Sequence, residues 1–208
     1  MEGVIVEIME AIYQRKSTRN FRNIKISNIV LEEIICAGIQ APSPKNDQPW
    51  NFVVVVNKEK KEKIADILEQ QLRKLKEEND NKGIYRKDII GAFQSVKILR
   101  EASVVIFVYL NNKVYEAHDD NVKWELSAKD IECTHIMSIG AAIQNMLLAA
   151  TQNKVDSLWM GDIFYAYNDL KAYLGEEGCI MAAVALGYGF GEPYKSSRKI
   201  IDEVVTYI

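Results

Sequence analysis

Two basic, hydroxyl-containing stretches near opposite ends of the chain have the residue types that hold a phosphate group. One is Arg15-Lys16-Ser17-Thr18-Arg19, and the other is Lys195-Ser196-Ser197-Arg198. Guanidinium forks, hydroxyls and main-chain N–H groups can donate hydrogen bonds to one phosphate from several directions. In an extended segment Arg15, Ser17 and Arg19 would share one face. The two stretches therefore indicate an anion-binding site, although charge alone also fits a solvated surface.

A proline-rich turn, Ala41-Pro42-Ser43-Pro44-Lys45-Asn46-Asp47-Gln48-Pro49-Trp50, adds a second feature. Each proline fixes its φ angle and removes one N–H donor. The N–H groups of Ser43, Lys45 and Asn46 are left free to point at a ligand. The alternative is a rigid loop that only connects a helix to a strand.

The elements around these motifs follow from apolar patterns. Helical spacing predicts a first helix that ends near Tyr13, and Ser27 is a candidate N-cap for a second helix that stops at the prolines. Runs rich in β-branched residues predict buried strands at 52–56, 102–110 and 179–186. The basic run therefore follows a helix, and the proline-rich turn precedes a strand.

Other segments would flank or cover the site. Residues 58–78 predict a helix with a solvated charged face, and residues 136–150 predict a buried helix, with a second subunit as one candidate to cover it. The stretches 79–94 and 111–130 are less regular and could cover a site. The apolar tail 204–208 is of the kind that completes a neighbour's sheet.

The composition fits one globular domain over residues 1–208. The chain has 208 residues, of which 48% are hydrophobic and 26% charged, and its net charge is −3. That length can bury an ample core, and the weak negative charge gives no general attraction for nucleic acid or anionic lipid. Neither a signal peptide nor an apolar run of about 20 residues is expected, which favours a cytoplasmic protein that does not contact a membrane.

The cysteines and histidines form no recognisable metal or redox motif. Cys36, Cys133 and Cys179 are far apart and odd in number, which favours buried, reduced thiols. With only His118 and His135 in the chain, no metal site is expected. His135, at the start of an expected helix, suggests a structural or capping role, whereas His118 lies in a polar stretch and is expected to be exposed.

The glycine-rich stretch Gly187-Tyr188-Gly189-Phe190-Gly191 follows a strand but does not fit a dinucleotide-binding loop. No helix can start cleanly at Glu192-Pro193, and the acidic residue of a following βαβ unit has no room. We interpret the stretch as a turn. A nicotinamide would then be a transient reductant rather than a resident cofactor.

Taken together, the order and spacing of the motifs resemble the FMN-dependent nitroreductase family. The resemblance extends from Ile12 to about Val205 and depends on four features: R-K-S-T-R-x-F at 15–21, A-P-S-x-x-N-x-Q-P-W at 41–50, L-W-M-G at 158–161, and Arg198 after G-x-P. It implies an α+β fold with a central, mostly antiparallel sheet flanked by helices. It also implies a homodimer with two FMN sites at the interface and a C-terminal strand exchanged with the partner subunit.

The resemblance implies cofactor contacts for three groups of residues. The first would contact the FMN phosphate, ribityl chain and pyrimidine edge: Arg15, Lys16, Ser17, Arg19 and, closing the phosphate site, Arg198. The second would lie against the isoalloxazine from the partner subunit: Pro42, Ser43 and Asn46, with Gln48 and Trp50 shaping that wall. The third matches a turn whose N–H groups address flavin N5 and O4: Trp159, Met160 and Gly161. Since main-chain groups act there, the Met160 side chain is expected to tolerate substitution.

Two positions depart from the family pattern or leave it open. Many relatives have a basic residue where this chain has Ser196, and Lys195 is a candidate substitute. The helix before the second strand often donates an amide or lysine to the flavin, and Gln94, Ser95 and Lys97 are all candidates.

The activity implied is an FMN-dependent oxidoreductase that takes electrons from NAD(P)H and passes them to a nitroaromatic or quinone by a ping-pong mechanism. This chemistry requires no side-chain acid, so no catalytic residue is assigned. Specialised reactions of related subfamilies, namely dehalogenation, azoline oxidation and flavin destruction, stay open as alternatives. So does a non-catalytic protein that binds or delivers flavin.

Overall fold

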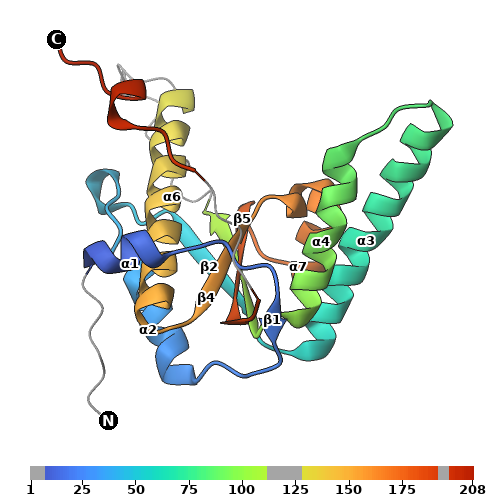
Figure 1. Ribbon diagram of the computed structural model, residues 1–208, viewed down its shortest axis with the longest axis horizontal. Helices are drawn as coiled ribbons and strands as arrows, with labels where there is room; N and C mark the ends of the chain where they lie inside the picture. The colour runs from blue at the N-terminus through green and yellow to red at the C-terminus, as the bar shows by residue number, and fades with distance from the viewer. Residues whose placement is uncertain (1–7, 112–127, 192–196) are drawn as a thin grey trace.

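The structure, a computed structural model, describes residues 8–111, 128–191 and 197–208 (Figure 1). Strands β3 (Val104–Leu110) and β5 (Cys179–Gly189) form the centre of a five-stranded sheet. β2 (Trp50–Val55) pairs with β3, and both β4 (Asp156–Met160) and the short β1 (Phe21–Arg22) pair with β5. All of these pairs are antiparallel, which confirms the predicted mixed fold with a mostly antiparallel sheet.

Helices cover both faces of this sheet. α2 (Asn28–Ile39) and α6 (Ala128–Gln152) lie on one face, and α3 (Lys58–Asn81), α4 (Lys87–Glu101) and α7 (Tyr167–Leu174) lie on the other. Side chains of β3 alternate between the two layers, as expected for a strand buried on both faces. Its odd-numbered residues from 105 to 109 pack with α3 and α4, and its even-numbered residues pack with α2 and α6.

Helices α3 and α4 form a hairpin that extends away from the sheet in Figure 1. Arg100 of α4 joins the hairpin by donating to Asp66 and Glu69 at 2.8 Å each. Hydrogen bonds from Arg100 and then Arg73 hold the pKa of Glu69 below its ordinary value. Here the prediction of an irregular segment at 79–94 was wrong, because its later part belongs to α4.

The helical pattern of α4 is concealed by Gly91 and by polar residues within the same turns. Its buried residues Ile89, Ala92, Val96 and Leu99 recur at intervals of three and four, which is the spacing of one helix face. Gly91 lowers helix propensity by about 1 kcal/mol relative to alanine, which weakens the local helical signal of this segment.

Several predicted boundaries are close to those of the structure. Ser27 caps α2, where its Oγ accepts a hydrogen bond from the N–H of Val30 at 3.3 Å, as predicted. The first helix, α1 (Ile8–Gln14), ends one residue beyond the predicted Tyr13. Most of the stretch predicted at 111–130, including His118, lies outside the described residues.

Helix α6 is the central helix of its layer. It is long and apolar enough to cross a bilayer by length and composition, with a mean hydropathy of 1.2 in its most apolar window. However, Ala142, Ile143 and Met146 are fully buried against α2 and the sheet. We therefore assign α6 to the core of this fold, in agreement with the prediction of a buried helix.

The three cysteines lie within the described residues and are not joined in disulfides, but the prediction that they are buried was wrong for two of them. Cys36 on α2 and Cys133 on α6 are exposed in the single chain, and Cys179 is partly buried. Ile34, two positions before Cys36, is fully buried. Two positions on a helix differ by about 200° in direction, so apolar neighbours in sequence did not indicate burial of Cys36 itself.

Candidate functional site

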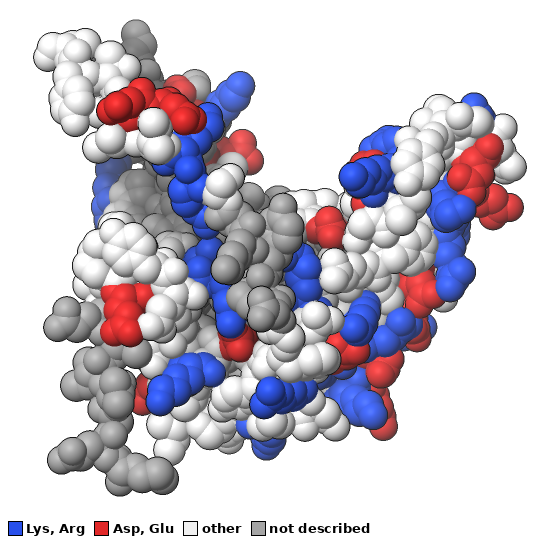
Figure 2. Space-filling model, viewed as in Figure 1, with Lys and Arg blue, Asp and Glu red and all other residues white. Residues whose placement is uncertain are grey.

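A cavity of about 480 Å³ opens where the start of β4, the end of β5 and helix α4 meet. Its volume is within the range of small-molecule and cofactor sites. The lining residues come from four parts of the chain: Lys16, Ser17, Thr18, Arg19, Asn20, Gln94, Asp156, Gly189, Phe190 and Gly191. On the face shown in Figure 2, Lys and Arg side chains gather in the middle of the molecule, between α6 and the α3–α4 hairpin.

The basic run reaches this cavity because it is tied to β4. The N–H of Arg15 still donates to the carbonyl of Ala11 at 2.9 Å, which continues the hydrogen bonding of α1. The chain then becomes extended, since Ser17 forms a parallel bridge with Ser157 and the N–H of Thr18 donates to the Ser157 carbonyl at 3.0 Å. This pairing holds the run along the start of β4.

The lining does not follow the alternation that the sequence suggested. Lys16 and Thr18 line the cavity together with Ser17 and Arg19, whereas Arg15 does not line it. The reason is that the run follows the rim of the cavity after leaving α1, and only a bridge of one residue pair is strand-like.

Asp156 connects the basic run to the end of β5. Its Oδ1 accepts a hydrogen bond from the Thr18 hydroxyl at 3.1 Å and lies 3.6 Å from Lys16 Nζ. Its Oδ2 accepts from the N–H of Gly189 at 2.9 Å. Among the lining residues, Lys16 and Arg19 outweigh this one carboxylate, so the cavity retains a positive charge that suits a phosphate.

The glycines at the end of β5 belong to this site, so their interpretation as a turn was wrong. β5 runs through Gly187 and Gly189, and Gly189, Phe190 and Gly191 line the cavity. A Cβ on Gly187 would lie 2.7 Å from Cδ1 of Phe21, and one on Gly189 would lie 2.6 Å from Cγ2 of Thr18. The absence of a side chain therefore allows close approach of neighbouring segments.

We expect Gly189→Ala to displace Thr18 and Asp156, because its Cβ would also lie 2.8 Å from Oδ2 of Asp156. Overpacking of this kind costs about 1–3 kcal/mol, and we expect that loss in the free energy of unfolding measured by chemical denaturation. The matched control is Gly91→Ala, where an added Cβ meets nothing within 4 Å. That variant should be more stable than the unmodified chain, and equal effects at both glycines would contradict the assigned close approach.

The sequence left three candidate positions open on helix α4, and the structure places them differently. Gln94 lines the cavity. The hydroxyl of Ser95 instead donates to Oδ2 of Asp162 at 2.5 Å, and Nζ of Lys97 donates to Oδ1 of Asn20 at 3.1 Å. Gln94 is therefore the α4 side chain that can reach a bound molecule, whereas Ser95 and Lys97 hold neighbouring segments.

At the end of β4 the side chains of Trp159 and Met160, which precede Gly161, differ in burial. Trp159 is 45% exposed, whereas Met160 is 2% exposed and packs in the α3–α4 core. This burial contradicts the expectation that the Met160 side chain is tolerant. The Met160 side chain is therefore part of the hydrophobic core.

Accordingly, Met160→Ala should lower the free energy of unfolding by about 2–5 kcal/mol, the range for large-to-small changes in a core. The measurement is chemical denaturation of the purified protein. Met137, which is 65% exposed on α6, provides the matched control. A Met137→Ala loss as large as that of Met160→Ala would show that burial of Met160 is not the cause.

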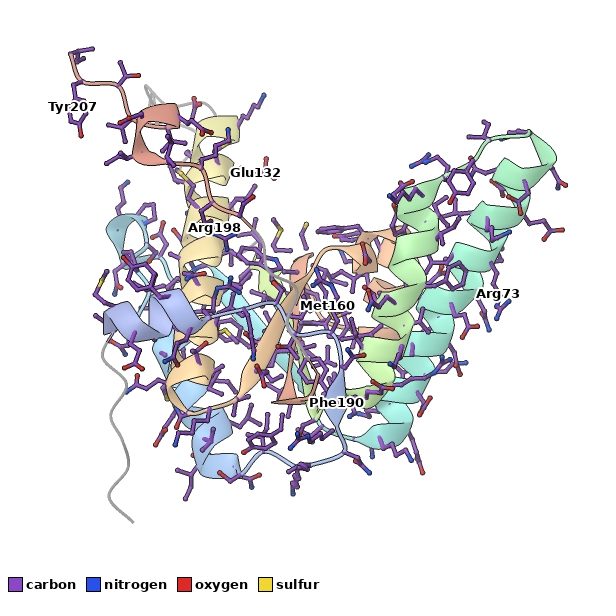
Figure 3. The ribbon with its side chains drawn as sticks, viewed as in Figure 1. Arg73, Glu132, Met160, Phe190, Arg198 and Tyr207 are labelled. Carbon is purple, nitrogen blue, oxygen red and sulfur yellow. The ribbon has the colours of Figure 1, made fainter. Side chains whose placement is uncertain are left out.

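The remaining predicted residues lie outside this cavity in the single chain. The turn with Pro42, Ser43 and Asn46 contacts α6, where η1 (Pro44–Asn46) packs. Arg198 lies well apart from Phe190 in Figure 3, and in this chain its Nη1 donates to the Ser197 carbonyl at 3.3 Å. Lys195 and Ser196 lie outside the described residues.

The sequence interpretation assigned no ligand contact to the lining residues Thr18, Asn20, Asp156, Gly189, Phe190 and Gly191. Thr18 lies within the basic run and Asn20 directly follows it, so the position of both residues in the sequence could have indicated them. Asp156 had no local signal, and the glycine-rich stretch that contains Gly189 was interpreted as a turn. Their shared role arises from a contact between segments 33 residues apart.

Comparison with known proteins gives concordant results. The Nitroreductase family model matches residues 12–188. A relative from Archaeoglobus fulgidus, named provisionally as an NADH dehydrogenase/NAD(P)H nitroreductase, is 28% identical over 187 residues, or 88% of this chain and 85% of the relative. An iodotyrosine deiodinase from Hydra vulgaris is 31% identical over 147 residues, or 65% of this chain and 50% of that protein.

A solved structure shares the fold over nearly the whole length. It comes from Desulfovibrio desulfuricans and is described provisionally as a nitroreductase in complex with FMN. Its sequence identity is 27%, its TM-score is 0.69, and the alignment covers 97% of this chain and 96% of that one.

Proposed function

The chain belongs to the nitroreductase family of FMN-dependent NAD(P)H oxidoreductases, and from this premise we propose that it reduces an electron-poor small molecule, such as a nitroaromatic or a quinone, by a ping-pong mechanism. The observation that carries the proposal is the cavity between β4, β5 and α4. Four consecutive residues of the basic run, the adjacent Asn20 and the glycine-rich end of β5 line it.

The donor set of the cavity fits an FMN phosphate and its polar chain. Lys16 and Arg19 supply positive charge, Ser17 supplies a hydroxyl, and Gly189 removes side-chain bulk next to them. Gln94 adds an amide from the opposite wall. When bound, FMN would supply the capacity to accept hydride from a nicotinamide and to return electrons to an acceptor.

The residues of this chain would bind and orient the cofactor rather than exchange protons with the substrate. We propose phosphate, ribityl and pyrimidine contacts for Arg15, Lys16, Ser17, Arg19 and Arg198. We propose isoalloxazine contacts for Pro42, Ser43 and Asn46. Main-chain N–H groups at Trp159, Met160 and Gly161 would address the N5 side, where a donor stabilises the charge that develops on reduction.

In a homodimer, the proline-rich turn and Arg198 of one subunit could lie beside the cavity of the other. The proline-rich turn and Arg198 lie outside the cavity of the single chain, so a second copy is a natural source for the missing wall. Exposed apolar side chains support such an interface on α1, on α6 and in the C-terminal segment: Ile8, Tyr13, Met137, Ile200, Val204 and Tyr207. Exchange of the segment 204–208 between subunits is part of this proposal.

We further propose that residues 1–208 act as one FMN-binding domain in the cytoplasm. The free, exposed thiols of Cys36 and Cys133 favour a reducing compartment. A small-molecule acceptor is the partner that the cavity suits, since its volume of about 480 Å³ matches a cofactor with a small substrate beside it.

The deciding experiment is an absorbance spectrum of the purified protein before and after anaerobic NADH or NADPH. We expect bound yellow flavin that the nicotinamide bleaches and that a nitroaromatic or quinone restores. Yellow protein that nicotinamide does not bleach would favour a flavin-storing or delivering protein. A colourless protein that does not take up added FMN would refute the proposed function.

Reductive dehalogenation is the second candidate, because the Hydra vulgaris relative is named an iodotyrosine deiodinase. The two candidates differ in the acceptor that reoxidises the bleached protein. Reoxidation by an iodinated phenol with release of iodide, and not by a nitroaromatic, would favour dehalogenation.

A further inference from the structure

The proline-rich turn Ala41–Trp50 has an uncommon backbone. Lys45, Asn46 and Gln48 have positive φ angles of 50°, 60° and 47°. Residues other than glycine rarely have a positive φ angle, and they keep it only where surrounding contacts stabilise that conformation. They also cluster at functional sites, so the contacts that hold this turn indicate how its function is maintained.

Contacts within the turn stabilise its shape. The hydroxyl of Ser43 accepts a hydrogen bond from the N–H of Gln48 at 2.9 Å, and the Ser43 carbonyl accepts from the N–H of Asn46 at 3.1 Å. The N–H of Asp47 donates to the carbonyl of Pro44 at 2.9 Å. These bonds close the turn on itself but do not fix it relative to the sheet and helices.

The ends of the turn are anchored in the body of the protein. Ala41 and Trp50 are 8% and 9% exposed, and the carbonyl of Pro49 accepts a hydrogen bond from the N–H of Asn111 at 2.8 Å. The middle of the turn is largely exposed. It therefore needs an attachment of its own.

Asp47 provides an attachment in the middle of the turn. Its Oδ2 lies 3.2 Å from Nε2 of His135, a residue 88 positions away on α6. The His135 side chain is 1% exposed and that of Asp47 is 28% exposed. An ionised carboxylate only accepts hydrogen bonds, so Nε2 of His135 is the donor.

The part of α6 that carries His135 is firmly packed in the protein. His135 lies inside the helix, and its neighbours Ser138 and Ile139 are 5% and 2% exposed. The sequence interpretation of His135 as a capping residue therefore does not apply, because α6 begins at Ala128. The buried imidazole of His135 therefore connects the rigid helix α6 to the strained turn Ala41–Trp50.

We propose that His135 is a positioning residue, which fixes the turn Ala41–Trp50 through Asp47 and thereby fixes the wall that Ser43 and Asn46 contribute to the flavin site. The inference rests on the proposed function, in which this turn lies against the isoalloxazine. Without the contact, the turn relaxes toward less strained conformations. FMN binding must then restore the order that the His135–Asp47 contact otherwise provides.

Two measurements on the full-length protein test this proposal. The first is trypsin cleavage after Lys45 in cofactor-free protein, with His135→Leu compared with His135→Gln. We expect at least about ten-fold faster cleavage in His135→Leu, since a charge-assisted hydrogen bond is lost. His135→Gln should cleave at nearly the unmodified rate, because the glutamine amide can also donate to Asp47.

The second measurement is FMN affinity with the visible circular dichroism of the bound flavin. Asp47→Ala leaves α6 unchanged, and it should weaken FMN binding about ten-fold and alter the dichroism. The double variant Asp47→Ala/His135→Leu should bind no more weakly than Asp47→Ala. Glu132→Ala, which removes an exposed carboxylate from the same helix, is the control and should change neither readout.

The outcomes separate this inference from the proposed function. An unchanged rate of cleavage after Lys45 in His135→Leu would show that the His135–Asp47 contact does not fix the turn, whatever that variant does to the stability of the protein. Faster cleavage with unchanged FMN affinity and dichroism in Asp47→Ala would overturn the link to the flavin site. Failure of the unmodified chain to bind FMN would overturn the proposed function and, with it, this inference.

Discussion

Arg19→Ala is expected to bind FMN about 10–100-fold more weakly than the unmodified chain and to lose its cofactor during purification. A hydrogen bond between charged groups contributes about 1.5–3 kcal/mol, which corresponds to this change in affinity. Arg19 lines the cavity, and the hydrogen bond that its side chain makes there is a long one of 3.5 Å to the carbonyl of Ser17. Its guanidinium is therefore available for a phosphate. Fluorescence titration of FMN measures the change.

Two comparisons make this prediction specific. Lys16→Ala should have a smaller effect, because Lys16 Nζ already lies 3.6 Å from the Asp156 carboxylate. Arg22 is the matched control, since it is an exposed arginine on β1 that does not line the cavity. Equal losses in Arg22→Ala and Arg19→Ala would mean that general positive charge, not a contact in the cavity, retains the cofactor.

The same titration tests the two arginines that lie outside the cavity of the single chain. Arg15→Ala and Arg198→Ala should each weaken FMN retention if the partner subunit and the bound cofactor bring them to the phosphate. Unchanged occupancy in the double variant would remove both residues from the phosphate site. Lys16, Ser17 and Arg19 would then account for it alone.

The sequence predicted best those features that depend on neighbouring residues. The cap at Ser27 and the buried strand β3 follow from local pattern, because a hydroxyl before a helix and a run of β-branched residues have the same effect in most folds. The motif near Arg15–Arg19 was found for a similar reason. Its residue types indicate an anion site before the fold is known.

Features that depend on distant contacts could not be predicted. Asp156 and Gly189 meet because β4 pairs with β5. No motif surrounds Asp156, and the glycine-rich stretch around Gly189 does not indicate this contact. Likewise, His135 and Asp47 are 88 positions apart, so no local pattern joins them. The division of the proposed site between the cavity and the proline-rich turn has the same origin, since it depends on where α6 places the turn.

Deletion of residues 204–208 is expected to produce a monomer that retains little FMN. The segment follows η3 (Ile201–Glu203) and is exposed along its length in the single chain, with Val204 61% exposed and Ile208 fully exposed. Burying a Val or Ile side chain contributes about 1.5–3 kcal/mol, so losing several weakens a dimer by about 10³-fold or more. FMN is lost as well, because half of each proposed site comes from the partner. Sedimentation velocity with flavin absorbance measures both effects together.

Tyr207→Ser and Tyr85→Ser provide the matched pair for this prediction. The two tyrosines are 85% and 76% exposed, but Tyr207 lies in the C-terminal segment and Tyr85 lies at the tip of the α3–α4 hairpin. If exposed apolar surface alone caused association, both variants would weaken the dimer to a similar degree. If the C-terminal segment forms the interface, only Tyr207→Ser should do so. A truncated chain that stays dimeric and yellow would instead favour an interface on α1 and α6, because those helices also present exposed apolar side chains.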